Sequence, residues 1–224
     1  MCTVTFVPLK QGFCITSNRD ESIIRSIAIP PLKYHINAKV VYFPKDPKAG
    51  GTWFAHDKKN CIVLLNGGKE KHIRKKNYRK SRGLIVTELI SSNNPLIEWD
   101  TINLEAIEPF TIVLFTSDKL YQLQWSDSEK EKKEFDATKH HIWSSTTLYS
   151  KTKREERANW FHDFMSTNTD INENKILNFH QFTHAKNKDY GLQINRDNKL
   201  QTISITQCLM VKNNFTLKYI DLVN

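Results

Sequence analysis

Met1-Cys-Thr-Val-Thr-Phe-Val7 opens the chain, and Ser17-Asn-Arg-Asp-Glu21 follows it after one predicted turn. Residues 2–7 alternate between polar and apolar side chains as in a half-buried strand, residues 8–12 have turn composition, and residues 13–17 predict a second strand. A hairpin of this length brings the polar tetrapeptide, residues 18–21, back beside the start of the chain. The fold is therefore expected to begin with a hairpin whose open end carries charged side chains.

Cys2 is a candidate nucleophile that would carry its own base. Removal of the initiator Met1 is expected before a residue as small as cysteine, and it would leave a thiol and a free α-amine on one residue. Because the α-amine titrates near ~7.7 to 8.0 and the thiol near ~8.5, a proton can pass between them at neutral pH without a histidine. The alternative is a buried, inert thiol at the start of a strand.

Length and composition fit one globular domain over residues 1–224. With 39% apolar residues, the chain can bury a sizeable core without disulfides. Its cysteines lack the spacing of zinc sites, which predicts a reducing compartment and no structural metal. No segment is long and apolar enough to span a bilayer, and the start of the chain lacks a signal sequence, so we expect a cytoplasmic protein with no membrane span.

The formal net charge of +9 is concentrated in one stretch, residues 69–82, in which Tyr78 is the aromatic residue. A basic stretch with so few aromatic side chains does not indicate nucleic-acid binding. We expect a solvated loop. If this loop bordered a cleft, it would attract a small anionic ligand in a salt-dependent manner.

The pattern of apolar residues along the rest of the chain predicts an α+β fold. Strand-like runs lie at residues 39–43, 52–55, 61–65, 110–116, 119–124, 135–143, 200–211 and 215–223, and helical runs lie at residues 83–91, just after 94–95, at 150–165 and at 173–182. The polar segment 126–134 is expected to be a surface turn, and Arg157 is expected to be exposed on its helix. Two mainly antiparallel sheets, each faced by helices on its outer side, satisfy this order.

Several motifs carry a resemblance to a known family. Met1-Cys-Thr-Val-Thr-Phe6 with Ser17-Asn-Arg-Asp-Glu21, then Gly50-Gly-Thr-Trp-Phe54 and Leu64-Leu-Asn66, resemble the NRDE family, also called the transport and Golgi organisation family. The resemblance implies an N-terminal-nucleophile (Ntn) hydrolase-like fold, a four-layer αββα sandwich similar to the cysteine acylases that cleave penicillin V and bile-salt amides. It also implies an arginine and a carboxylate beside the N-terminal cysteine.

In those acylases the arginine and the aspartate lie three residues apart, at positions that correspond here to Asn18 and Glu21. The arginine of this chain is displaced by one residue, to Arg19, and the carboxylate is either Asp20 or Glu21. Because alternate side chains of a strand face opposite sides, Asn18 and Asp20 are expected on one face and Arg19 and Glu21 on the other. An arginine near the sulfur favours the thiolate, and a carboxylate holds the α-amine.

The catalytic candidates are Cys2, Arg19, Asp20, Glu21 and Asn66, and the substrate-binding candidates are Asn18, Gly51, Thr52, Trp53 and Ser145. Asn66 can donate its side-chain amide to an oxyanion, and Ser144 and Ser145 stand where the acylases supply a second asparagine. Arg157 and Arg196 are candidates for a late arginine of the acylases. In the alternative interpretation, Arg19 and a carboxylate pair only to hold a turn, Trp53 belongs to the core, and Asn66 begins an ordinary glycine turn.

Three functions are consistent with these residues. The first is a cysteine amidohydrolase that acts on a small non-peptide C–N (amide) bond with Cys2 as nucleophile. The second is a non-catalytic binding or trafficking protein for haem or another hydrophobic anion, such as an acyl compound. The third is a structural or interaction protein with Cys2 buried. In each case we expect a small-molecule or protein partner, no nucleic acid and no metal, and no cofactor unless haem is bound as a ligand.

Overall fold

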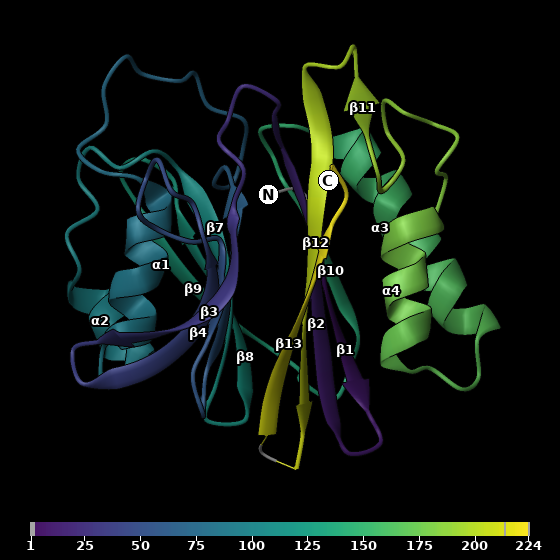
Figure 1. Ribbon diagram of the computed structural model, residues 1–224, viewed down its shortest axis with the longest axis horizontal. Helices are drawn as coiled ribbons and strands as arrows, with labels where there is room; N and C mark the ends of the chain where they lie inside the picture. Colours follow the sequence, from purple (N-terminus) through teal and green to yellow (C-terminus); the bar gives the residue numbers. More distant parts are fainter. Residues whose placement is uncertain (1–2, 213, 224) are drawn as a thin grey trace. The chain divides into compact units, whose positions relative to one another are not determined.

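The computed structural model describes residues 3–212 and 214–223, and Figure 1 shows the course of the chain. The chain forms two compact units. One contains the chain up to Arg25 and from Thr138 onward, and the other contains Ser26–Ala137. We call them the terminal unit and the central unit. Each consists of one antiparallel sheet with a pair of helices, so the predicted α+β class is confirmed.

The terminal unit is built on a six-stranded sheet with the order β10-β1-β2-β12-β11, in which β13 also pairs with β12. Its strands are β1 Thr3–Leu9, β2 Gly12–Ser22, β10 His141–Ser144, β11 Asn195–Arg196, β12 Leu200–Val211 and β13 Asn214–Asp221, and its helices are α3 Lys151–Thr167 and α4 Glu173–Phe182. Both helices lie on the same face of this sheet (Figure 1). Every strand pairing in it is antiparallel.

The predicted hairpin is present as β1 and β2, with Thr3 opposite Asn18 and Leu9 opposite Gly12. Strand β2 is longer than expected, because it continues through the polar tetrapeptide to Ser22. Gly12 has φ +146°, and a Cβ atom there would lie 1.7 Å from the carbonyl oxygen of Met210. Glycine at this position therefore allows β2 to approach β12.

An apolar core fills the space between this sheet and its helices. Its buried members are Val7, Cys14, Phe161, Ile176, Phe179 and Leu192. Phe164 and Met165 of α3 pack against them. One residue of α3 differs from expectation, since Arg157 is 1% exposed rather than at the surface.

The central unit contains a seven-stranded sheet in the order β3-β4-β5-β6-β7-β8-β9. Its strands are β3 Ile29–Ile36, β4 Lys39–Lys45, β5 Phe54–His56, β6 Cys61–Asn66, β7 Phe110–Thr116, β8 Lys119–Trp125 and β9 Lys130–Phe135, and its helices are α1 Arg82–Ser91 and α2 Pro95–Thr101. Helix α1 packs on β6, β5 and β4, and α2 packs on α1. The prediction of a surface turn at residues 126–134 was wrong, because residues 130–134 belong to strand β9.

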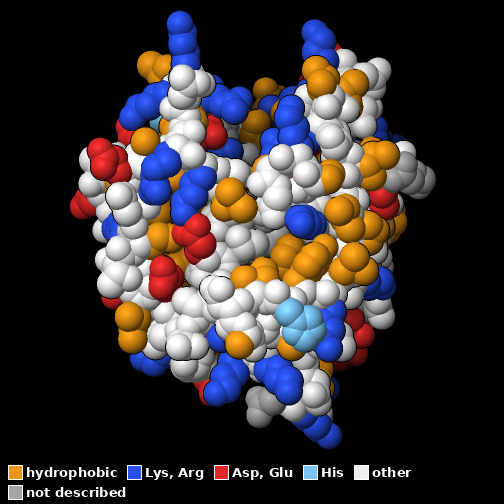
Figure 2. Space-filling model, turned by 60° about the vertical axis from the view of Figure 1, so that its left-hand side comes forward, with side chains coloured by type: hydrophobic (Ala, Val, Ile, Leu, Met, Phe, Trp, Pro, Cys, Tyr) orange, Lys and Arg blue, Asp and Glu red, His pale blue; other side chains and the backbone are white. Residues whose placement is uncertain are grey.

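The basic stretch 69–82 is an irregular segment whose cations are partly neutralised. Lys69 pairs with Glu131 at 3.0 Å, and Arg82 pairs with Glu108 at 3.2 Å. On the face of the molecule in Figure 2, lysine and arginine side chains lie at separate places, with acidic side chains between some of them. This arrangement favours a solvated loop over a continuous basic surface.

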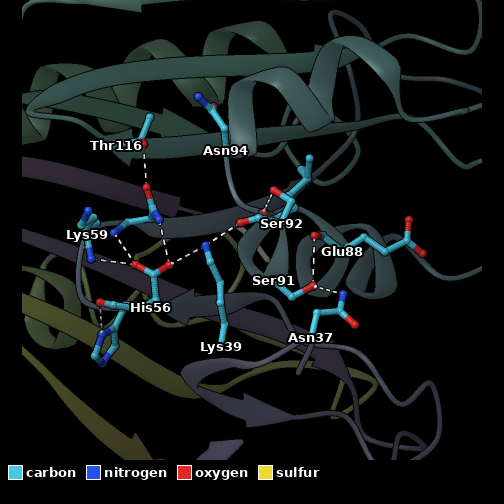
Figure 3. A network of polar contacts seen from close by, with 12 residues as sticks. Asn37, Lys39, His56, Lys59, Glu88, Ser91, Ser92, Asn94 and Thr116 are labelled. Atoms are coloured by element: carbon cyan, nitrogen blue, oxygen red, sulfur yellow. Dashed lines mark hydrogen bonds and ion pairs between the residues drawn. The ribbon is translucent and has the colours of Figure 1, made fainter. Parts of the chain in front are cut away.

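A polar network joins α1 to the sheet of the central unit (Figure 3). Lys39 of β4 donates to the carbonyl of Ser92, the C-cap of α1, at 2.5 Å and lies 3.3 Å from the Asp57 carboxylate. Asp57 also accepts from the backbone and side chain of Asn60, which in turn accepts from the Thr116 hydroxyl at 2.6 Å. The lysine thus neutralises a helix C-terminus while the carboxylate holds the β5–β6 turn.

No helix among the described residues is both long and apolar enough to cross a membrane.

Candidate active site

The open end of the β1–β2 hairpin is the place where the predicted site residues of the terminal unit come together. Thr3 of β1 is paired with Asn18 of β2 on one side and with Ser144 of β10 on the other. Cys2 lies outside the described residues, so the site can be built from Thr3 onward. In the sequence, Cys2 directly precedes Thr3.

The side chains of the tetrapeptide alternate between the two faces of β2, as predicted. Asn18 and Asp20 bond to residues on the helix-covered side, and Arg19 and Glu21 extend to the opposite side. Arg19 is 3% exposed, and its Nη2 atom lies 3.8 Å from Oε2 of Glu21. Arg25 approaches the same oxygen at 3.7 Å. Of the two candidate carboxylates, Glu21 is the one that shares a face with Arg19.

Asp20 is held on the helix side by two hydroxyl groups. Tyr149 donates to one carboxylate oxygen at 2.6 Å, and Thr202 donates to the other at 2.6 Å. All three residues are buried. These bonds fix Asp20 to β12 and to the segment that precedes α3, so its position is that of a structural anchor beside the Arg19–Glu21 pair.

Asn18 is also tied to the helix layer, through the fully buried His180 of α4. The Asn18 amide donates to the carbonyls of Leu192 and His180 at 2.7 and 3.2 Å, and its oxygen meets Nδ1 of His180. Burial lowers the pKa of His180 to about 3, assisted by the Arg157 charge, so the ring is neutral at pH 7. Since the Asn18 oxygen can only accept, Nδ1 carries the proton and Nε2 accepts from the Thr5 hydroxyl at 2.8 Å.

Arg157 is the functional candidate whose position the sequence did not predict. Its guanidinium donates to the Thr3 hydroxyl at 2.5 Å and to the carbonyl of Gly191 at 2.6 Å, and it stacks on the Tyr149 ring, 3.6 Å from the ring centroid. The polar spacing of residues 151–157 indicated an exposed helix start. Only the contacts with β1 and with residues 190–191, far apart in sequence, place this arginine inside.

Ser145 lies just after β10, next to Ser144, which is the β10 partner of Thr3. It is 1% exposed and shares a hydrogen bond of 2.9 Å with the Thr147 hydroxyl. Its predicted contact with substrate stays a prediction. Arg196, the second candidate for a late arginine, lies over the rings of Tyr149 and Tyr190 at 5.2 and 5.1 Å.

The remaining candidates, Gly51, Thr52, Trp53 and Asn66, belong to the central unit. The backbone approaches closely at Gly51: the Thr52 N–H donates to the Gly83 carbonyl at 3.1 Å, and a Cβ on Gly51 would lie 2.3 Å from the carbonyl carbon of Gly83. Trp53 is 4% exposed. Asn66 is the last residue of β6, where it is paired with Phe110. Convergence of these residues with the hairpin of the terminal unit stays a prediction.

Neither a metal cluster nor a reactive thiol is found among the described residues. They contain no group of three histidine, cysteine or acidic side chains that could hold a metal ion. Cys14, Cys61 and Cys208 are free and fully buried, and burial raises the pKa of the Cys14 thiol to about 12. His180 and His184 do not share a helix face, because α4 ends at Phe182.

Comparison with known proteins gives a family and a fold. The family model described as Transport and Golgi organisation 2 matches residues 1–218. Among solved structures, a variant of conjugated bile acid hydrolase from Clostridium perfringens is similar over 99% of this chain and 92% of its own, with 11% identity and a TM-score of 0.55. A mutant of Anbu from Hyphomicrobium sp. strain MC1 is similar over 100% and 90%, with 8% identity and a TM-score of 0.41. No curated protein matches the sequence significantly. The likeness to the bile acid hydrolase confirms the Ntn-hydrolase-like fold.

Proposed function

Because the chain belongs to the Transport and Golgi organisation 2 family and shares its fold with a conjugated bile acid hydrolase, we propose that it is an N-terminal cysteine amide hydrolase. Its substrate class is a small non-peptide amide, in which a carbon–nitrogen bond is cleaved. Fold likeness alone does not carry activity from one protein to another, so the proposal depends on the residues of the site.

The observation that carries the proposal is the Arg19–Glu21 pair at the open end of the hairpin, in which Arg19 is buried and Glu21 is partly exposed. Arg19 is 3% exposed, and its Nη2 atom lies 3.8 Å from a carboxylate oxygen of Glu21, so a positive charge is held away from solvent at this end of β2. A buried cation stabilises an anion, such as a thiolate, that lies near it. The strand paired with β2 begins at Thr3, so the residue that precedes Thr3 in the sequence is the nearest candidate for that anion.

The reaction then follows from Cys2 with Met1 removed. The thiol passes its proton to the α-amine, the sulfur attacks the carbonyl carbon, and the proton moves to the leaving nitrogen as the C–N bond breaks and a C–S bond forms. A water molecule next attacks the thioester carbon. It gives one proton to the α-amine, and the C–S bond breaks with return of that proton to sulfur. Arg19 favours the thiolate, the attacking species.

The proposal is tested first on the thiol itself. Intact mass shows whether Met1 is absent, and the pH dependence of iodoacetamide labelling gives the pKa of the thiol. Because the three other cysteines are fully buried, labelling of the folded protein reports on Cys2. We expect the thiol pKa to lie below the ordinary value of about 8.5. Retention of Met1, or a thiol that reacts only after unfolding, would refute the proposal.

Turnover is tested with acyl amides of increasing chain length, for which Cys2→Ser should be inactive.

Arg19→Gln should raise the pKa of the Cys2 thiol, because it removes the positive charge that favours the thiolate. Arg25→Gln is the matched control, because Arg25 approaches the same Glu21 oxygen from a side chain that is 35% exposed. The alternative function, a carrier of haem or another hydrophobic anion, predicts saturable haem binding with a shifted Soret band and no turnover of any amide.

A further inference from the structure

We infer that one end of the central sheet binds the surface of a membrane that contains anionic lipids, with exposed isoleucine side chains inserted among the lipid headgroups. This end is the one at which β3 begins and β6 ends. The inference is independent of the proposed hydrolase activity, because it concerns attachment to a surface and requires no bond to be cleaved.

The strand register brings two separate segments to this end of the sheet. Ile29 at the start of β3 is paired with Lys45 at the end of β4. Phe54 at the start of β5 is paired with Val63 in the second half of β6. Because the strands from β3 to β6 are antiparallel to their neighbours, the segment that precedes β3 and the segment that follows β6 leave the sheet at the same end, the upper end of the central unit in Figure 1.

Aliphatic side chains of both segments are exposed to solvent. Ile27, just before β3, is 63% exposed, and Leu32, within β3, is 54% exposed. Ile73, in the segment after β6, is 93% exposed. A single exposed aliphatic side chain is ordinary at a protein surface, but several at one end of a sheet, on two segments, indicate an interaction surface.

Positive charge accompanies these apolar side chains. Residues 22–45 contain lysine and arginine but no aspartate or glutamate. Several cations of the basic stretch 69–82 are paired with acidic groups. Lys71 and Lys76, on either side of Ile73, are exposed, and neither forms an ion pair with a residue of the described chain. The charge of this surface is therefore complementary to an anionic partner.

The combination of lysine with aliphatic side chains favours a lipid surface over a macromolecular partner. Interfaces between proteins are enriched in aromatic side chains and arginine and depleted of lysine. Single-stranded nucleic acid is bound by aromatic side chains that stack on its bases, and the basic stretch contains one aromatic residue, Tyr78. Membrane surfaces are instead bound by lysine and arginine next to apolar side chains, which reach the boundary between headgroups and acyl chains. Such binding is peripheral and needs no spanning helix.

Binding is measured by sedimentation of the full chain with vesicles of phosphatidylcholine, with and without phosphatidylserine. We expect the protein to bind the phosphatidylserine vesicles, more weakly as the salt concentration rises, and to bind pure phosphatidylcholine little. A wild-type protein that stays in solution with phosphatidylserine vesicles at low salt would overturn the inference. Equal binding to both kinds of vesicle would also overturn it, because the lysines would then have no role.

The insertion of isoleucine is tested by combining Ile27→Gln and Ile73→Gln in one protein. Because two side chains no longer transfer from water to the membrane, partition onto phosphatidylserine vesicles should fall about tenfold. Ile97→Gln is the matched control, since Ile97 is also 63% exposed but lies on helix α2, and it should bind as the wild type does. Thermal unfolding in parallel shows that the variants are folded. Wild-type partition of the double variant would contradict insertion.

The contribution of charge is tested by combining Lys71→Gln and Lys76→Gln. Each lysine close to an anionic surface should account for about a fivefold change in partition at low salt. The control combines Lys58→Gln and Lys59→Gln, two exposed lysines in the β5–β6 turn at the opposite end of the same sheet. An equal loss in both double variants would show that only the net charge of the chain matters, and the assignment of binding to this end of the sheet would then be wrong.

Discussion

His180 is neutral in the folded protein over a pH range in which a histidine of the unfolded chain is charged. Burial lowers its pKa from 6.5 to about 3. Between these two values the unfolded chain binds more protons than the folded protein, so the free energy of unfolding must fall as the pH decreases through this range. Between pH 6.5 and about pH 3, we expect the titration of His180 to lower the free energy of unfolding by up to about 1.4 kcal/mol for each pH unit of acidification.

The measurement is urea unfolding of the wild type and of His180→Gln at pH 7, 6 and 5. Glutamine can still bond to Thr5 or to Asn18, and it does not titrate, so the variant should be less stable at pH 7 and should lose less stability on acidification. His162→Gln, at an exposed position of α3, is the control and should follow the wild-type slope. Parallel slopes for the wild type and His180→Gln would show that His180 titrates normally in the folded protein.

At the scale of secondary-structure elements, Lys39 is expected to hold the end of α1 on the sheet of the central unit. Its ammonium group donates to the Ser92 carbonyl at 2.5 Å and lies 3.3 Å from Asp57, which is 6% exposed. Lys39→Met keeps most of the apolar stem and leaves both partners without the cation, so we expect a loss of about 1–3 kcal/mol in the free energy of unfolding. Urea titration measures it. Lys33→Met, at an exposed position of the neighbouring strand β3, should change this energy by less than about 0.5 kcal/mol.

The elements that the sequence predicted correctly are those with a strong local signal. The hairpin β1–β2 follows from alternation around a turn, and α2 begins where expected because Asn94 caps it and Pro95 occupies its first turn. Strand β3 was not predicted, because Pro30 and Pro31 lack the backbone N–H groups that pair strands. The strand forms nevertheless, because it lies at the edge of its sheet, where proline is tolerated. Strand β9 was taken for a turn because its side chains are mostly charged, which is also typical of an edge.

The same distinction applies to the candidate site. Alternation along one strand correctly placed Arg19 with Glu21 and Asn18 with Asp20. It could not show that Tyr149 and Thr202 hold Asp20, nor that Arg157 is buried against Thr3, since these contacts join residues more than a hundred positions apart. Helical periodicity predicts the buried face of a helix from its apolar residues. An arginine on that face is therefore predicted to be exposed, even where it is buried.

At the scale of the whole molecule, the order of the chain couples the two units. The terminal sheet contains β2 and β10, which are separated in sequence by the entire central unit, residues 26–137. If the central unit unfolded alone, those residues would become one long flexible loop between two strands of a folded sheet. Closing a loop of this length costs on the order of 4 kcal/mol, and a folded central unit with fixed ends avoids much of that cost.

We therefore expect the chain to unfold as one domain, as its length and composition predict. Lys39→Met destabilises the central unit and His180→Gln the terminal unit, and in native-state hydrogen exchange each variant should accelerate the slowest amides of both sheets by the same factor. An exchange change confined to one sheet would instead identify two independently unfolding domains, because a substitution then affects only the unit that contains it. Urea transitions followed by tryptophan fluorescence and by circular dichroism should coincide for the single domain and separate for the two.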